Sequence, residues 1–138
     1  MPRIVHIALK VDALDEASEF YQKVFGFKHT GTRRAGPLKD HISCWLSDGD
    51  IGFTLIKYDS ESAPEASIVG PGPCIHHFGI AVEPDKLDEY IAMLKGYNCE
   101  LISPPGTNPM KFRAPGGGIC EVGTPDKFPL EGDGRASN

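Results

Sequence analysis

The chain has 138 residues and a mass of 14.9 kDa, about the length of one domain, so its length excludes a multidomain assembly. Its composition, 40% hydrophobic and 24% charged, is that of a soluble globular fold. The net charge of −5 comes without a block of like charges, which gives no indication of nucleic-acid or membrane binding, so the expected partner is a small molecule. We find no apolar run of about 18 residues and no signal-peptide pattern, so the expected compartment is the cytoplasm.

The first predicted strand, residues 5–11, is repeated later in the chain. It has the sequence Val-His-Ile-Ala-Leu-Lys-Val, and residues 76–82, shifted by 71 positions (77 − 6), have the sequence His-His-Phe-Gly-Ile-Ala-Val. Apolar residues at helical spacing follow each copy, from Leu14 to Phe25 and from Leu87 to Leu94. Asp12 is a candidate N-cap for the first helix, and Gly26 and Gly96 are candidate stops. The chain therefore has an internal repeat.

Short alternating segments follow each helix and predict further strands. They are residues 41–46 and 51–58 in the first half and residues 99–102, 110–113 and 119–122 in the second. We predict an α+β fold of two βαβββ modules, 3–59 and 74–124, within a single domain of residues 1–125. Residues 60–73 are expected to be a linker, and residues 126–138 a loose C-terminal tail. The four cysteines form no Cys-x-x-Cys pair and are expected to be buried hydrophobes.

Side chains alternate across a strand, so the apolar set identifies the core face and the other set faces elsewhere. By this rule His6, Ala8 and Lys10 leave the core face of the first strand, and His77, Gly79 and Ala81 leave that of its repeat. The small residues leave volume in front of the two imidazoles. Glu121 occupies the equivalent face of the last strand. Two histidines and one carboxylate form a triad that holds a divalent ion and leaves positions open for substrate.

Other side chains are expected on the same face. Thr54 occupies the position in the first module that Glu121 has in the second. His41 and Trp45 leave the core face of the strand that begins at residue 41. His76 is expected to be packed or hydrogen-bonded on the core side, although a slip of one residue would exchange it with His77.

These segments together resemble the vicinal oxygen chelate superfamily, which includes glyoxalase I, bleomycin-resistance proteins and extradiol dioxygenases. The resemblance covers nearly the whole chain before the tail. It depends on both histidine-bearing strands, the end of the first helix at residues 20–27, and the turn and strand of residues 114–121. It implies a cup-shaped mixed sheet around a metal, commonly completed in a homodimer, so that His6 of one chain would meet His77 and Glu121 of the other.

The resemblance implies a metal-dependent enzyme whose substrate chelates the ion through vicinal oxygens. Members with glyoxalase I activity have a fourth ligand, which is also the catalytic base, at the position of Thr54. Threonine cannot perform that role, so the leading hypothesis is an extradiol-type dioxygenase with three protein ligands. His41 is then the candidate acid–base catalyst. Trp45, Thr54, Phe112 and Arg113 are the candidate substrate-binding residues.

Several alternatives stay open. A glyoxalase-like lyase or isomerase would use the metal as a Lewis acid. A fosfomycin-type transferase would need more cations than Lys111 and Arg113 supply. A metal-free binding protein of the bleomycin-resistance kind and a vestigial structural module are hypotheses from other classes. Fe(II) and Mn(II) are the favoured ions, and zinc and nickel also accept this ligand set.

Overall fold

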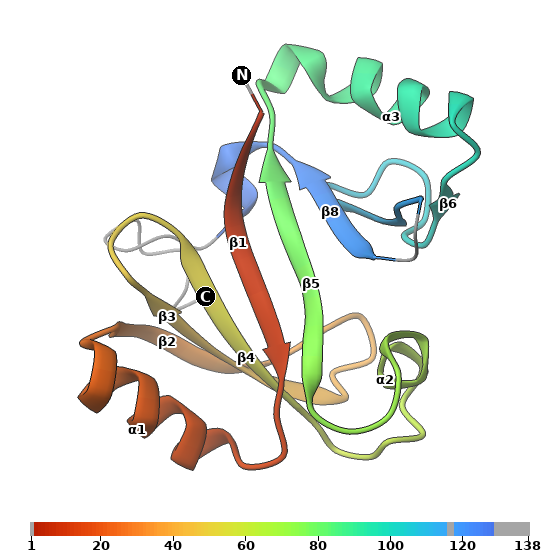
Figure 1. The fold of residues 1–138 in the computed structure, drawn as a ribbon. Helices are drawn as coiled ribbons and strands as arrows, with labels where there is room; N and C mark the ends of the chain where they lie inside the picture. The colour runs from red at the N-terminus through yellow and green to blue at the C-terminus, as the bar shows by residue number, and fades with distance from the viewer. Residues whose placement is uncertain (1, 116–117, 129–138) are drawn as a thin grey trace. The chain divides into compact units, whose positions relative to one another are not determined.

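The computed structural model describes residues 2–115 and 118–128 and consists of two compact units. Of the described residues, the first unit contains residues 2–6 and 77–115 and 118–128, and the second contains residues 7–76. The boundaries between the units fall within β1 and within β5. Figure 1 shows the strands and helices of each unit.

The elements confirm the predicted α+β class and the two βαβββ modules. The first module contains β1 (Arg3–Lys10), α1 (Leu14–Phe25), β2 (Lys28–Ala35), β3 (His41–Ser47) and β4 (Gly52–Tyr58). The second contains β5 (Cys74–Ala81), the short helix η1 (Pro84–Lys86), α3 (Leu87–Gly96), β6 (Glu100–Leu101), β7 (Met110–Arg113) and β8 (Ile119–Gly123). The helix α2 (Pro64–Val69) lies between the modules, and η2 (Pro125–Lys127) follows β8. The eight strands form a mixed sheet that is open, since β2 and β6 end the described strand order.

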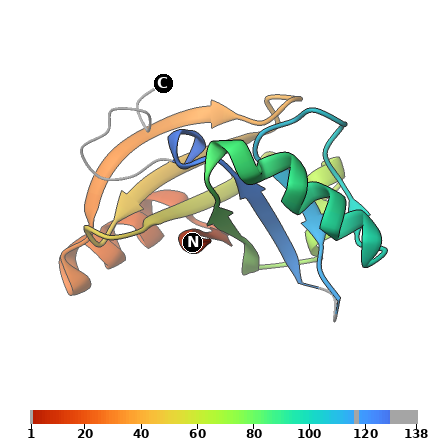
Figure 2. The same cartoon turned by 90° about the horizontal axis from the view of Figure 1, so that it is seen from above.

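The strands of the first unit are paired in the order β5, β8, β7 and β6. Strand β8 runs parallel to β5 and antiparallel to β7. The side chains of Val82, Met110, Phe112, Cys120 and Val122 form the core on one face, against which Tyr90, Ile91 and Leu94 of α3 pack. Figures 1 and 2 show α3 along this part of the sheet. The opposite face carries Glu121, which determines the side of the sheet on which a site can form.

The second unit contains the antiparallel strands β2, β3 and β4. Its main core joins Cys44, Leu46 and Leu55 to Leu14, Ala17 and Tyr21 of α1. The helix ends as predicted at Gly26, which has the left-handed φ of 74° that glycine adopts at little steric cost. The expected N-cap Asp12 is not used: Ala13 occupies that position, and no side chain caps the helix.

Two elements of the second unit were not located from the sequence, although the predicted βαβββ pattern implied a further strand in the first module. Strand β2 contains two arginines and a glycine and is largely exposed, so it lacks the apolar alternation that identifies a half-buried strand. Helix α2 is only six residues long and forms within the segment assigned to a linker. Ala63 and Ala66 pack with Ala8, Ile56 and Tyr58, so α2 covers a small core of its own.

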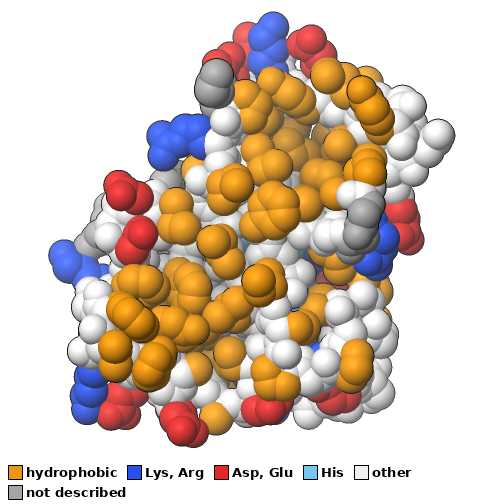
Figure 3. Space-filling model, viewed as in Figure 1, with side chains coloured by type: hydrophobic (Ala, Val, Ile, Leu, Met, Phe, Trp, Pro, Cys, Tyr) orange, Lys and Arg blue, Asp and Glu red, His pale blue; other side chains and the backbone are white. Residues whose placement is uncertain are grey.

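Surface apolar side chains gather in two areas of the face shown in Figure 3, one near α3 and one near α1. Phe20, Val24 and Phe25 of α1 and Met93 of α3 are among the exposed large hydrophobic residues. Beside α3, an apolar cavity of about 350 Å³ is lined by residues that include Tyr90, Met93, Tyr97 and Phe112. No helix in the described part of the chain is long and apolar enough to cross a membrane.

Candidate metal site

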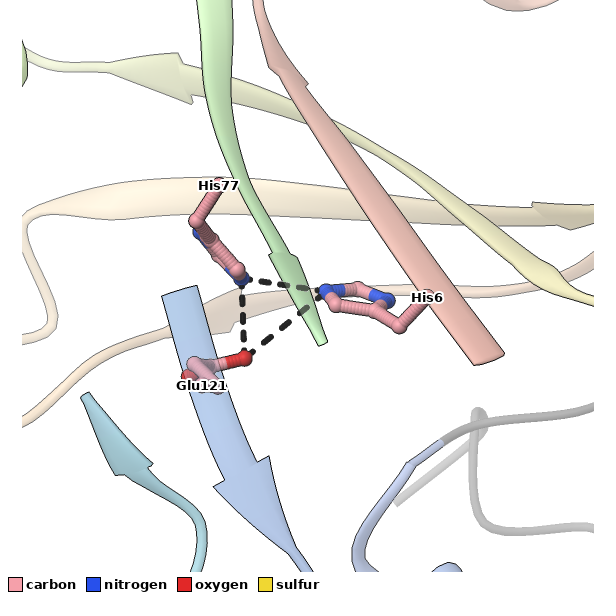
Figure 4. A group of neighbouring side chains, drawn as sticks. All are labelled: His6, His77 and Glu121. Atoms are coloured by element: carbon pink, nitrogen blue, oxygen red, sulfur yellow. Dashed lines mark hydrogen bonds and ion pairs between the residues drawn. The ribbon is translucent and has the colours of Figure 1, made fainter. Parts of the chain in front are cut away.

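His6, His77 and Glu121 lie together in the first unit, as the sequence predicted. Their ligand atoms all lie within 4.8 Å of one another. Figure 4 shows the three side chains pointing toward one another from β1, β5 and β8. In the described structure all three residues belong to one chain.

The strand register explains why the trio forms. Gly79 is the partner of Glu121 across the parallel pair β5 and β8, and side chains two residues apart on a strand share a face. His77 therefore lies on the same face as Glu121. His76, the alternative in case of a register slip, is turned away from that face, and its Nε2 lies 2.6 Å from the Tyr58 hydroxyl.

The distances within the trio fit a common ion. Nε2 of His77 lies 3.1 Å from Nε2 of His6 and 2.9 Å from Oε1 of Glu121. Two ligand atoms that are about 2.1 Å from one ion and at right angles to each other are about 3.0 Å apart. The third separation, 4.0 Å between Nε2 of His6 and Oε1 of Glu121, is below the roughly 4.2 Å of ligands on opposite sides of an ion. The three atoms can therefore contact one divalent cation.

Burial and local charge give two members of the trio the protonation state that a cation needs. Burial is the largest cause lowering the pKa of His6 to about 4, and the charge of His77 lowers it further while Glu121 opposes the change. For Glu121, burial alone would raise the pKa. The charge of His77 and its hydrogen bond, together with His6 and Lys111, outweigh burial and lower that pKa to about 2. At neutral pH, His6 is thus a neutral donor and Glu121 a carboxylate.

Phe128 borders the site and was not anticipated from the sequence. Its side chain is 1% exposed, and its ring centroid lies 5.8 Å from that of His6. Nδ1 of His6 is buried with no hydrogen-bond partner among the described residues, so packing holds this side of the ring. Phe128 belongs to the stretch assigned to the loose tail; of that stretch, residues 129–138 lie outside the described residues, as do Gly116 and Gly117 of the predicted turn. The only sequence feature that could have indicated this role for Phe128 is that it is a lone aromatic residue in a Gly- and Pro-rich stretch.

Gly79 does not leave open volume in front of the imidazoles, contrary to the prediction. A Cβ at this position would clash with the Phe128 ring and lie 3.1 Å from Cβ of His6. Ala8 is likewise fully buried, packed against Ala63 and Ala66 beside α2. Lys10, expected on the same open face, is 4% exposed, and its Nζ donates to Glu61 and to the carbonyl of Gly70. Other segments of the chain therefore fill the space beside these residues: Phe128 lies beside Gly79, and the alanines at α2 pack against Ala8. Glu61 and Gly70 bind the Lys10 ammonium.

The remaining predicted residues of the first unit lie on β7. Phe112 is the cross-strand partner of Cys120 and shares the apolar core, so it faces away from Glu121, and the expectation that it borders the site is wrong. Lys111 is the direct partner of Glu121 and shares its face. Arg113 lies two residues further along that face, and its Nε is 3.2 Å from Oε1 of Glu100.

The other predicted residues belong to the second unit. His41 is 6% exposed, with Nδ1 3.1 Å from Oδ1 of Asp40 and its ring against Tyr58. Trp45 and Thr54 are cross-strand partners on β3 and β4. The Arg33 guanidinium lies 5.0 Å from the centre of the Trp45 ring. Oγ1 of Thr54 is buried and has no hydrogen-bond partner among the described residues.

Comparisons with known proteins agree with this architecture. A sequence model of the Glyoxalase/Bleomycin resistance protein/Dioxygenase superfamily matches residues 3–122, so the chain belongs to this superfamily. No curated protein matches the sequence.

Solved structures with a similar fold include the following three. A methylmalonyl-CoA epimerase from Mycobacterium tuberculosis is 19% identical, with a TM-score of 0.71 and 89% of each chain covered. A variant of 4-hydroxymandelate synthase from Streptomyces coelicolor is 20% identical, with a TM-score of 0.73, covering 96% of this chain and 41% of that one. A hypothetical protein from Bacillus halodurans is 22% identical, with a TM-score of 0.70, covering 88% of this chain and 92% of that one. At these identities the likeness shows the fold alone.

Proposed function

We propose that this member of the superfamily is a divalent-metal-dependent enzyme with His6, His77 and Glu121 as the protein ligands. Its substrate is a small molecule that contacts the ion through two neighbouring oxygens. The observation that supports this most directly is the convergence of two imidazole Nε2 atoms and one carboxylate oxygen within 4.8 Å. Glu121 is kept ionised in a buried position beside His77, so a carboxylate oxygen is available to a cation at this point.

Three ligands leave coordination positions open, which is the arrangement of catalytic rather than closed structural sites. Two histidines and one carboxylate with open positions are typical of non-haem Fe(II) oxygenases. We therefore keep an extradiol-type dioxygenase as the leading activity, with Fe(II) as the first ion to test and Mn(II) as the second. When bound, the ion would supply Lewis acidity and, if it is iron, one-electron chemistry with O₂.

The chain's own residues have separate tasks in this proposal. His6 orients a neutral nitrogen toward the ion and His77 a second nitrogen, and Glu121 supplies a charge that its surroundings keep ionised. Phe128 covers one side of His6 and excludes water there. We assign Lys111 and Arg113 to the substrate side, because they share the face of Glu121.

His41 is proposed as the proton-transfer residue. Asp40 holds its Nδ1, which favours the tautomer with the proton on Nδ1 and leaves Nε2 to accept a proton. Trp45 and Thr54 are proposed substrate contacts in the second unit. The homodimer stays a prediction.

Metal content is the direct test. We expect elemental mass spectrometry of protein purified anaerobically without an affinity tag to find about one iron or manganese per chain. His77→Ala should lose it, because the substitution removes the nitrogen closest to both other ligands. His29→Ala is the matched control, since His29 is exposed and bonds Thr32. Equal metal affinity in wild type and His77→Ala would overturn the assignment.

Activity assays then separate the reactions. Oxygen uptake with catechols by the iron-loaded protein supports the dioxygenase. Turnover of a thiol adduct or an α-hydroxy carbonyl without oxygen supports the lyase or isomerase instead. Absence of metal after reconstitution would replace both with the metal-free binding protein.

A further inference from the structure

The apolar cavity beside α3, about 350 Å³ in volume, lies on the face of the sheet that points away from Glu121. Its floor includes the side chains of Val82, Phe112 and Val122, each at most 6% exposed. All of its lining residues belong to the first unit. The cavity is therefore separated from the proposed metal ligand Glu121 by the sheet itself.

Helix α3 does not close over this floor. None of its residues is fully buried, although Tyr90 and Leu94 pack toward the sheet. Met93 is 52% exposed and Tyr97, directly after the helix, is 76% exposed, and both line the cavity. Figure 3 shows apolar side chains gathered in this area. Apolar surface on the helix side thus stays in contact with water, and a ligand that covers it would gain free energy.

The cavity has a polar neighbour. A second pocket of about 260 Å³ adjoins it, because Tyr90 and Met93 line both. Glu83, Lys86 and Glu89 also line this second pocket. Lys86 and Glu89 pair across 3.6 Å, and Glu83 has an interaction of its own, so the pocket offers hydrogen-bonding groups without favouring a ligand of one charge. A mainly apolar wall with a few polar groups is typical of small-molecule sites.

We propose that the two pockets together bind an uncharged amphiphile, with its apolar body in the cavity and a hydroxyl or amide end toward Lys86 and Glu89. The apolar volume is within the range of about 300–1,000 Å³ for ligand sites and more than twice the roughly 150 Å³ in which benzene binds. A bicyclic aromatic or a medium-length alkyl chain is of suitable size. A concave lining of this extent suits a small molecule, whereas a stable protein interface needs about 800 Å² from each partner. The proposal does not depend on the metal.

The fluorescent probe N-phenyl-1-naphthylamine tests the site, because it is uncharged and its emission rises in apolar surroundings. We expect saturable binding to the full chain. Met93→Glu should weaken it at least about tenfold, since the substitution places a charge against the apolar body of the ligand. Val24→Glu is the matched control: Val24 is 60% exposed on α1 in the other unit, so this variant should bind the probe as the wild type does.

Cysteine protection locates the ligand in the wild-type chain. Cys99 lines the cavity and is partly exposed, whereas Cys74, also partly exposed, belongs to the second unit. With decan-1-ol at about ten times its Kd, alkylation of Cys99 by iodoacetamide should be about tenfold slower and that of Cys74 unchanged. Peptide mass spectrometry measures both rates. Decan-1-ol should also displace the probe better than decanoate or decylamine, whose charged ends would have to break the pair of Lys86 and Glu89.

Several outcomes would overturn the inference. Equal probe affinity in Met93→Glu and the wild type, or equal protection of Cys99 and Cys74, would show that the ligand does not bind in this cavity. Better displacement by decanoate or decylamine would contradict the uncharged class. A wild-type dimer that Met93→Glu converts to a monomer in light scattering would show that a second copy covers this face in place of a small molecule.

Discussion

Glu121 and Thr54 occupy equivalent positions in the two modules, and their surroundings differ in kind. Glu121 on β8 has Lys111 as its cross-strand partner, and its carboxylate lies close to the imidazoles of His6 and His77. Thr54 on β4 has Trp45 as its partner, and its hydroxyl is buried without a hydrogen bond among the described residues. The Glu121 position thus has ionisable neighbours, whereas the cross-strand neighbour of Thr54 is an aromatic residue. The two repeats share the strand arrangement, but the proposed ligands gather at the Glu121 position.

Small residues show a parallel difference. In the first unit, Gly79 makes room for Phe128 beside His6. In the second, Ala8 makes room for the alanines at α2. Both positions receive a segment of the same chain, but only in the first unit does that segment lie against a proposed metal ligand.

The largest expected effect comes from substituting Glu121, with the equivalent Thr54 substituted for comparison. Glu121→Gln keeps the shape but removes the charge, so metal affinity should fall at least about 100-fold, beyond the 10–100-fold typical of outer-shell changes. Thr54→Val should leave metal affinity unchanged and stability within about 1 kcal/mol, because it removes a hydroxyl that has no partner. Metal titration and urea unfolding measure both. Similar metal affinity of Glu121→Gln and Thr54→Val would contradict the proposal that Glu121, and not Thr54, is a metal ligand.

The contact between Gly79 and Phe128 gives the next effect. Gly79→Ala places a methyl group against the Phe128 ring and Cβ of His6, and should lower the free energy of unfolding by about 1–3 kcal/mol. Phe128→Ala removes a buried ring and should cost about 3–5 kcal/mol. In the double variant the methyl group has space, so the total cost should be smaller than the sum. Additive costs in a double-mutant cycle would show that the two residues do not contact each other.

Acid sensitivity of the metal-free protein is the third expected difference. The pKa of His6 is lowered from 6.5 to about 4, so the unfolded chain binds this proton first and stability falls as pH drops from about 6.5 toward 4, by up to about 3 kcal/mol. The lowered pKa of Glu121 adds a further loss between about 4.5 and 2. The equivalent Thr54 does not titrate.

Urea unfolding at pH 7.5, 5.5 and 4.5 checks this pH dependence. His6→Asn should flatten the decline between pH 6.5 and 4, whereas His29→Asn, a change at an exposed histidine, should keep it. An unchanged slope in His6→Asn would assign the acid sensitivity to another group.

The sequence by itself determined the repeat, the α+β class and the three candidate ligands, because these follow from local periodicity. Alternation along two similar strands placed His6 and His77 on equivalent faces, and alternation in residues 119–123 placed Glu121 with them. The same rule placed His76 on the other face. Strand β2 and helix α2 escaped prediction because neither has a distinct apolar period.

Only the tertiary structure decided what occupies the space beside the ligands. Nothing local indicates that Phe128 lies on His6, that Lys10 is covered by Glu61 and Gly70, or that Phe112 faces α3 while Lys111 faces Glu121. These contacts depend on strand register and on segments distant in sequence, and pairing register is set by the packing of whole faces. Local pattern therefore predicts which residues share a face, and long-range packing decides which of them meet.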